Sequence, residues 1–205
     1  MCESSINLNK KHLLKADFYS RDTARVAEEL IGKMLVRKLD SETLSGVIVE
    51  TEAYYGLDDP ASHAFRGKTK RSEIMFGRAG TAYVYFCYGM YYMLNAVTEK
   101  ENAPGAVLIR AVQPVEGVNR MFERREIKNI NKLANGPGKL TKAFGIDIND
   151  NGKDLTEEGS GLNIYDIFIK TSKLKISNSP RIGISAGIDR NLRFYLADSD
   201  FVSNK

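Results

Sequence analysis

The aromatic segment at residues 81–95 sets the strongest limit on what this chain can fold into. Six aromatic side chains fall within ten residues of it: Tyr83, Tyr85, Phe86, Tyr88, Tyr91 and Tyr92. Their alternation with period two, interrupted by Gly89, predicts two strands joined by a tight turn. Such a turn places Tyr88 at the tip, where side chains face solvent. A solvent-facing aromatic on a stiff hairpin suits stacking or wedging against nucleic-acid bases. The alternative is that these rings fill the core.

The composition indicates a single domain, because the chain has 205 residues, of which 42% are hydrophobic. The formal net charge is only +4, so the placement of the basic residues matters more than their sum. Lysines and arginines gather in two stretches, residues 66–78 and 120–142. Each stretch is either a nucleic-acid contact or ordinary solvated surface.

The cysteines, histidines and apolar runs disfavour several classes of protein. Two cysteines and two histidines lie far apart in the sequence, which disfavours a structural zinc site or a zinc deaminase. No apolar run reaches membrane-spanning length, and residues 1–19 are too polar for a signal peptide. We therefore expect a reduced, cytoplasmic protein with no metal site.

The order of the predicted elements favours an α+β fold, a single domain with a curved, largely antiparallel sheet, flanking helices and a protruding aromatic hairpin. Residues 1–15 are expected to form a loose arm and residues 16–205 the domain. Besides the hairpin, strands are expected at 33–39, 44–54, 106–112, 162–169 and 173–176. Helices are expected at 22–31, 115–128 and 140–144, with Asp22 as a cap and Gly32 as a stop signal for the first.

The strand expected at 44–54 carries the clearest candidates for chemistry. Alternation places Glu50, Glu52 and Tyr54 on one face, opposite a second set made up of Val47, Val49, Thr51 and Ala53. Carboxylates two residues apart on a strand face lie about 7 Å apart. In a desolvated pocket their repulsion raises one pKa, which suits a carboxylate that activates water. The alternative is an exposed face with two solvated glutamates.

Three further polar residues could line a pocket, although each also has a purely structural interpretation. His63 follows the carboxylate strand at a short loop distance, and a lone histidine is most often structural. Asn95 and Arg110 lie in or beside apolar strands, where polar residues usually make structural hydrogen bonds. No phosphate-binding loop, dinucleotide fingerprint, nucleophile elbow or metalloprotease motif is present.

Several ordered motifs resemble those of the alkyladenine (3-methyladenine) DNA glycosylases. The resemblance runs from about Phe18 to the C-terminus. Its motifs are Glu50-Thr-Glu-Ala-Tyr54, Ala61-Ser-His63, the aromatic segment with Asn95, residues 108–117, Gly136-Pro-Gly-Lys-Leu140, Arg181-Ile-Gly-Ile184 and Leu192-Arg-Phe-Tyr195. A resemblance to this family implies a monofunctional DNA glycosylase that removes alkylated or deaminated purines from double-stranded DNA.

The resemblance also implies a role for individual residues. Glu52 would activate the attacking water, with Arg110 beside it. The flipped base would lie between Tyr54, His63 and Tyr85, while Tyr88 would wedge into the minor groove and fill the vacated space. Asn95 would block the amino group of normal guanine. Backbone contacts are expected from basic residues of the two stretches: Lys68, Lys70, Arg71, Arg120 and Arg124.

These implied roles agree with the chemistry of base release. A base inside a duplex must first be extruded, at a cost of a few kcal/mol, and cationic alkylated purines stack well on electron-rich rings. One carboxylate can accept the proton of water and stabilise positive charge on the sugar. We expect no cofactor, no lyase activity, no membrane contact and a monomer in the cytoplasm, nucleoid-associated in a bacterium.

Two other functions remain open from the sequence. The first is a binding module for bent or damaged DNA that uses the same wedge without catalysis. The second is a hydrolase of free nucleosides, in which Tyr88 and the basic stretches would have no role. The preferred lesion among 3-methyladenine, 7-methylguanine, hypoxanthine and etheno-adenine also stays open.

Overall fold

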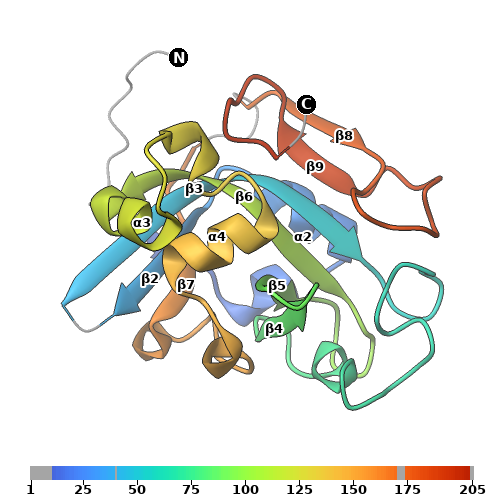
Figure 1. Cartoon of the computed structure of the whole chain (residues 1–205). Helices are drawn as coiled ribbons and strands as arrows, with labels where there is room; N and C mark the ends of the chain where they lie inside the picture. Colours follow the sequence, from blue (N-terminus) through green and yellow to red (C-terminus); the bar gives the residue numbers. More distant parts are fainter. Residues whose placement is uncertain (1–10, 40, 170–173, 204–205) are drawn as a thin grey trace.

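A curled antiparallel sheet organises residues 11–39, 41–169 and 174–203, which are the residues that the computed structural model describes (Figure 1). The strand order is β1-β7-β2-β3-β6-β5-β4, and β9 joins the sheet by pairing with both β3 and β8. The strands are β1 (His12–Leu13), β2 (Met34–Leu39), β3 (Glu42–Tyr54), β4 (Ala82–Cys87), β5 (Tyr91–Val97), β6 (Ala106–Glu116), β7 (Leu162–Asp166), β8 (Ile176–Ser179) and β9 (Arg193–Leu196). The expected α+β class and the curved antiparallel sheet are confirmed.

Short helices flank the sheet in the described segments. The α-helices are α1 (Ala16–Tyr19), α2 (Thr23–Leu30), α3 (Val118–Arg125) and α4 (Pro137–Phe144). The 3₁₀ helices are η1 (Glu73–Phe76), η2 (Ile130–Lys132), η3 (Ile148–Asp150) and η4 (Glu158–Ser160). No helix in these segments is long and apolar enough to span a bilayer.

The ends of the helices follow local backbone chemistry. The Asp22 side chain accepts a hydrogen bond from the Arg25 N–H and so caps α2 as expected. Pro137 occupies the first turn of α4, where its missing N–H costs nothing, so this helix begins earlier than the expected residue 140. The helix expected at 115–128 is shorter at both ends. It starts later because β6 continues to Glu116, and it ends at Arg125, where Glu126 adopts the left-handed conformation with φ 54°.

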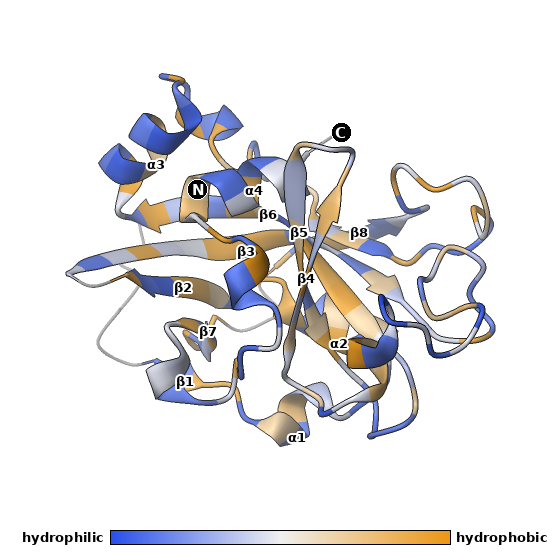
Figure 2. Cartoon of the chain, turned by 60° about the horizontal axis from the view of Figure 1, so that its bottom comes forward, coloured by the Kyte–Doolittle hydropathy of each residue, from blue (hydrophilic) through white to orange (hydrophobic). Residues whose placement is uncertain are grey.

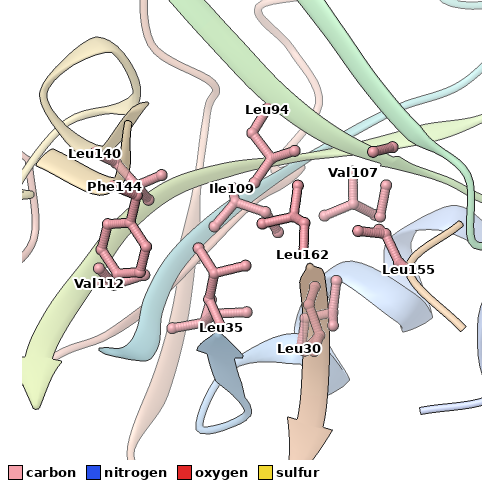
Figure 3. Packing of buried hydrophobic residues seen from close by; sticks show 14 of the residues in the cluster. Leu30, Leu35, Leu94, Val107, Ile109, Val112, Leu140, Phe144, Leu155 and Leu162 are labelled. Atoms are coloured by element: carbon pink, nitrogen blue, oxygen red, sulfur yellow. The ribbon is translucent and has the colours of Figure 1, made fainter. Parts of the chain in front are cut away.

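The hydrophobic core lies between the concave sheet and its helices (Figure 3). Leu30 of α2, Ile109 of β6 and Phe144 of α4 are fully buried in it. Hydrophobic residues concentrate on the strands, whereas α3 is largely hydrophilic (Figure 2). Burial of apolar area contributes about 25 cal/mol per Å², so this core holds the central strands β3 and β6 in fixed positions.

A β-bulge in β3 changes which side chains share a face. The register against β6 shifts between Ile48 and Glu50 and again between Glu50 and Thr51. Val49 packs against Val202 of the C-terminal segment, whereas the Thr51 hydroxyl donates to a backbone carbonyl of α2. The uninterrupted alternation predicted for 47–54 is therefore wrong, because a bulge inserts an extra residue into the ladder.

The aromatic segment forms two paired strands. β4 and β5 run antiparallel from Ala82 opposite Ala96 to Cys87 opposite Tyr91. Residues 88–90 connect them, and Tyr88 and Gly89 have positive φ angles of 53° and 68°. A tyrosine in this left-handed region is uncommon, and Tyr88 is 76% exposed.

The ends of the chain and one late strand differ from the sequence expectations. β1 pairs with β7, so His12 and Leu13 of the expected arm belong to the sheet, while residues 1–10 lie outside the described residues. The expected strand 162–169 ends at Asp166 as β7. Of the strand expected at 173–176, residue 173 lies outside the described residues, and β8 begins at Ile176.

Candidate active site

A cavity of about 320 Å³ lies where the paired strands β4 and β5 meet the ends of β3 and β6. Its lining brings together residues from several separate segments of the sequence. They are Tyr54, Ala61, His63, Met75, Tyr83, Tyr85, Cys87, Tyr88, Met93, Asn95, Ala106, Leu108, Arg110, Pro137, Ile182, Gly183 and Ile184. The lining therefore includes Tyr54, His63, Tyr85, Asn95 and Arg110, each of which the sequence singles out.

Glu52 lies directly behind the wall of this cavity and is fully buried. Its Oε1 accepts the Ile182 N–H at 2.7 Å, and its Oε2 accepts the Tyr54 hydroxyl at 2.8 Å. Arg110 Nη1 lies 3.1 Å from the same Oε2. Burial raises the pKa of Glu52 above its usual value, although these three neighbours act in the opposite direction and Glu50 adds a smaller upward effect.

Glu50 is equally buried but has a different environment. Its Oε1 accepts hydrogen bonds from Arg110 Nε and Arg193 Nε, both at 2.8 Å, and its Oε2 accepts the Ser203 N–H at 2.6 Å. Burial acts to raise the pKa of Glu50, but Arg110, the Ser203 N–H and Arg193 together hold it below its usual value. The alternative of two solvated glutamates is therefore wrong, and the raised pKa belongs to Glu52.

The aromatic part of the wall contains a histidine in contact with two tyrosines. His63 Nδ1 lies 2.8 Å from the Tyr83 hydroxyl, and the His63 ring lies edge-on to Tyr85 with centroids 4.7 Å apart. Burial and the nearby Arg71 lower the pKa of His63 to about 4. His63 is therefore neutral near pH 7, where one ring nitrogen donates and the other accepts.

Asn95 has both a structural bond and a place in the cavity wall. Its Nδ2 donates to the Tyr83 carbonyl at 3.0 Å across the β4–β5 pair. The side chain is almost fully buried and lines the cavity. The structural interpretation and the pocket interpretation from the sequence therefore both describe this residue.

Tyr88, in the connection between β4 and β5, lines the cavity and faces the loop that follows β8. A Cβ placed on Gly183 would lie 3.9 Å from the Tyr88 hydroxyl, so this side chain reaches toward that loop. Phe86 and Met90 beside it are also largely exposed. Exposed apolar side chains gathered at one point usually mark an interaction site.

The basic residues fall into two groups that lie apart in Figure 1, with α3 on one side of the β4–β5 pair and the loop after β3 on the other. Lys68, Lys70 and Arg71 are exposed on that loop, and the Arg71 guanidinium lies 5.0 Å from the Tyr85 ring. On α3, Arg120 pairs with Glu123 at 2.7 Å. Arg124 lies over Gly145 at the end of α4.

A second buried ion pair beside the cavity was not predicted from the sequence. Asp59 and Arg181 are joined by two contacts of 2.6 and 2.7 Å, and both side chains are 0% exposed. Asp59 belongs to a loop whose sequence is simply polar. Arg181 belongs to the Arg181-Ile-Gly-Ile184 motif of the glycosylase resemblance, and this motif is the sequence feature that draws attention to it. In the described part of the chain, no group of three or more potential ligands could hold a metal ion.

This arrangement can perform acid–base chemistry on a flat polar ligand. A buried carboxylate with a raised pKa is suited to accept a proton near neutral pH. Aromatic rings beside it offer stacking faces, and Arg110 supplies a fixed positive charge.

A model of the methylpurine-DNA glycosylase (MPG) family matches residues 17–200. A protein from Carboxydothermus hydrogenoformans is 46% identical over 200 residues, which cover 94% of this chain and all of that protein. A Clostridium perfringens protein is 43% identical over 204 residues, which cover 94% and 99% of the two chains. Both are provisionally named 3-methyladenine DNA glycosylase. This chain belongs to the methylpurine-DNA glycosylase family.

Proposed function

We propose that this protein is a monofunctional DNA glycosylase of base excision repair, which removes alkylated or deaminated purines from double-stranded DNA. The observation that carries the proposal is the buried Glu52 carboxylate, with its raised pKa, behind a cavity walled by aromatic rings. Family membership and the names of the relatives support the same activity.

In the proposed reaction, Glu52 activates the water that attacks the sugar. Glu52 Oε1 accepts one hydrogen bond from the described residues, that of the Ile182 N–H, and a carboxylate oxygen can accept two. A water on the cavity side can therefore donate to Oε1. As the glycosidic bond breaks, the carboxylate takes the water proton and attracts the positive charge that develops on the sugar. Arg110 holds Oε2, which fixes the carboxylate.

The flipped base is proposed to lie among Tyr54, His63 and Tyr85, where ring faces provide stacking. A neutral His63 can donate or accept a hydrogen bond at the base edge without adding charge. Tyr88 is proposed to fill the space that the base leaves, since an exposed ring on a short connection suits a wedge. Asn95 is proposed to reject the amino group of guanine.

No lysine lines the cavity in the described part of the chain, so an amine-dependent lyase step has no nucleophile there. The proposed step uses water and side chains alone, without a cofactor. Exposed Lys68, Lys70 and Arg71 are proposed to contact phosphates, as are Arg120 and Arg124. The enzyme is proposed to act as a monomer in the cytoplasm, on the nucleoid in a bacterium.

Base release from defined duplexes tests this function. Four duplexes would each carry one lesion: 3-methyladenine, 7-methylguanine, hypoxanthine or etheno-adenine. The proposal predicts free base and an uncut abasic strand from at least one of them, with no release from the matching free nucleoside. Tight binding without any release would favour a DNA-binding module instead. Equal release from duplex and nucleoside would favour a nucleoside hydrolase.

A further inference from the structure

The buried pair of Asp59 and Arg181 joins two loops that both contribute residues to the cavity lining. Asp59 belongs to the loop after β3, and Arg181 follows β8. Arg181 Nη1 and Nη2 each bond to a different oxygen of Asp59. Such a two-point contact fixes the orientation of both groups as well as their distance.

Arg181 also contacts the end of β3 that carries the site. Its Nη1 donates to the Ala53 carbonyl at 2.9 Å, between Glu52 and Tyr54 in the sequence. Its guanidinium lies 4.6 Å from the centroid of the Tyr54 ring. The arginine therefore restrains both the backbone and the ring on this side of the cavity.

The next residue along the chain reaches the carboxylate itself. The Ile182 N–H donates to Glu52 Oε1 at 2.7 Å, so an anchored Arg181 leaves this amide little freedom to turn away. On the other loop, Asp59 Oδ2 accepts the Tyr55 N–H at 3.0 Å and Oδ1 accepts the Ala61 N–H at 3.2 Å. These two bonds shape the loop that leads to His63.

We propose that Asp59 and Arg181 are positioning residues for base release, which hold the Tyr54 ring and the Ile182 N–H in place against Glu52. The inference rests on the proposed function. A buried ion pair is a weak source of stability, since well-packed apolar residues often replace one at little cost. An apolar replacement could not reproduce the bonds of this pair to Ala53 and to the two loops, or its charge beside Tyr54.

The test compares Arg181→Lys with a matched control, Arg37→Lys. Arg37 forms another strongly buried pair of this kind, with Asp150 at 2.6 Å, and neither of those residues lines the cavity. Both substitutions keep the charge and remove the planar guanidinium. Two quantities are measured on folded protein: the single-turnover rate on a hypoxanthine duplex, and the carboxyl titration of Glu52 by carbon-13 NMR, assigned with Glu52→Gln.

Arg181→Lys is expected to lower the rate at least about tenfold, which corresponds to about 1.4 kcal/mol of activation free energy. It is also expected to move the Glu52 titration to higher pH. In the unsubstituted protein the Ile182 N–H stabilises the ionised form of Glu52, and the substitution would weaken that hydrogen bond. Arg37→Lys is expected to leave the rate within about twofold and the titration unchanged. An Arg181→Lys protein with unchanged rate and unchanged titration would overturn the proposal.

If Arg181→Lys does not fold, Asp59→Asn takes its place in the same measurements, and failure of both variants to fold would overturn a positioning role. If the unsubstituted protein releases no base from any duplex, the proposed function fails. The titration comparison, which needs no activity, then still decides whether the pair positions the groups around Glu52.

Discussion

Arg110 Nη1 lies 3.1 Å from Glu52 Oε2, and the two side chains are 7% and 0% exposed. The same guanidinium donates through Nε to Glu50 at 2.8 Å, so one arginine connects both carboxylates. Arg193 provides a second positive charge for Glu50, whereas Glu52 depends on Arg110, Tyr54 and the Ile182 N–H. Neighbouring carboxylates with different partners are expected to have different roles.

Replacing Glu50 with Gln is expected to cost stability more than chemistry. Removing one member of a buried charge cluster costs about 3–5 kcal/mol in the free energy of unfolding. The pKa of Glu50 is lowered in the folded state. The ionised Glu50 side chain therefore stabilises the fold fully at pH values well above the pKa of the unfolded state, about 4.3. This stabilisation is lost as the pH falls below that value. Urea unfolding at several pH values would measure this.

Glu42→Gln is the matched control for that experiment, because Glu42 is an exposed member of a surface pair with Arg120. Its effect should stay within about 1 kcal/mol at every pH. Equal, small losses for the two variants would show that the buried cluster does not stabilise the fold through Glu50.

Replacing Tyr88 with Ala is expected to weaken capture of the flipped state by about 1–3 kcal/mol, the usual value of a base–aromatic stack. Folding should change little, because the side chain is 76% exposed and buries little apolar area. Lesion-duplex binding and thermal unfolding would be measured together. Phe168→Ala, an exposed aromatic beyond β7 at the other end of the sheet order, is the control and should leave binding unchanged. A collapse of stability with intact excision would identify Tyr88 as a structural residue.

Replacing Asn95 with Ser is expected to raise excision of normal guanine relative to hypoxanthine. The smaller side chain leaves room for the exocyclic amino group that the amide is proposed to reject. Removal of the bond to the Tyr83 carbonyl should cost about 1 kcal/mol of stability, but it affects all substrates alike. The ratio of single-turnover rates on the two duplexes is therefore the useful quantity. An unchanged ratio would restrict Asn95 to its structural bond.

Neutralising the exposed lysines Lys68 and Lys70 is expected to flatten the dependence of log affinity on log salt. The slope should fall by about 0.9 for each phosphate that the protein no longer neutralises. Lesion preference should not change, because phosphate contacts position DNA without reading bases. Arg120→Gln should have a smaller effect, since this arginine must first leave Glu123 and Glu42. Binding at a series of salt concentrations would show whether either group acts, and a slope that no variant alters would make both groups ordinary solvated surface.

The sequence predicts those parts of the fold that local chemistry decides. Asp22 before an apolar repeat and Gly32 after it define α2 closely, because caps and left-handed glycines act within a few residues. The bulge beside Glu50 was not predictable, since the alternation in the sequence continues through it and the register shift exists only in the pairing with β6. The start of α3 depends in the same way on how far β6 extends.

The residues of the candidate site also differ in whether a local sequence pattern or a long-range contact defines them. Glu52 and its aromatic neighbours stand out because they are grouped on strands with recognisable patterns. Asp59 and Ser203 do not, since each acts through a partner more than a hundred residues away in the sequence. Contacts of that kind follow from the assembled sheet and leave no local pattern.

The role of Glu52 is tested most directly by single-turnover base release from a hypoxanthine duplex, measured for Glu52→Gln, for Glu50→Gln and for the unsubstituted protein. Glutamine keeps the size of the side chain but can neither take the water proton nor carry negative charge. Because the folded pKa of Glu52 is raised, the unsubstituted protein should lose stability as the pH rises through it, and Glu52→Gln should not. We expect no release by Glu52→Gln, with lesion-DNA binding within about tenfold, or about 1.4 kcal/mol, and measurable release by folded Glu50→Gln. An active Glu52→Gln protein beside an inactive, folded Glu50→Gln protein would contradict this role of Glu52.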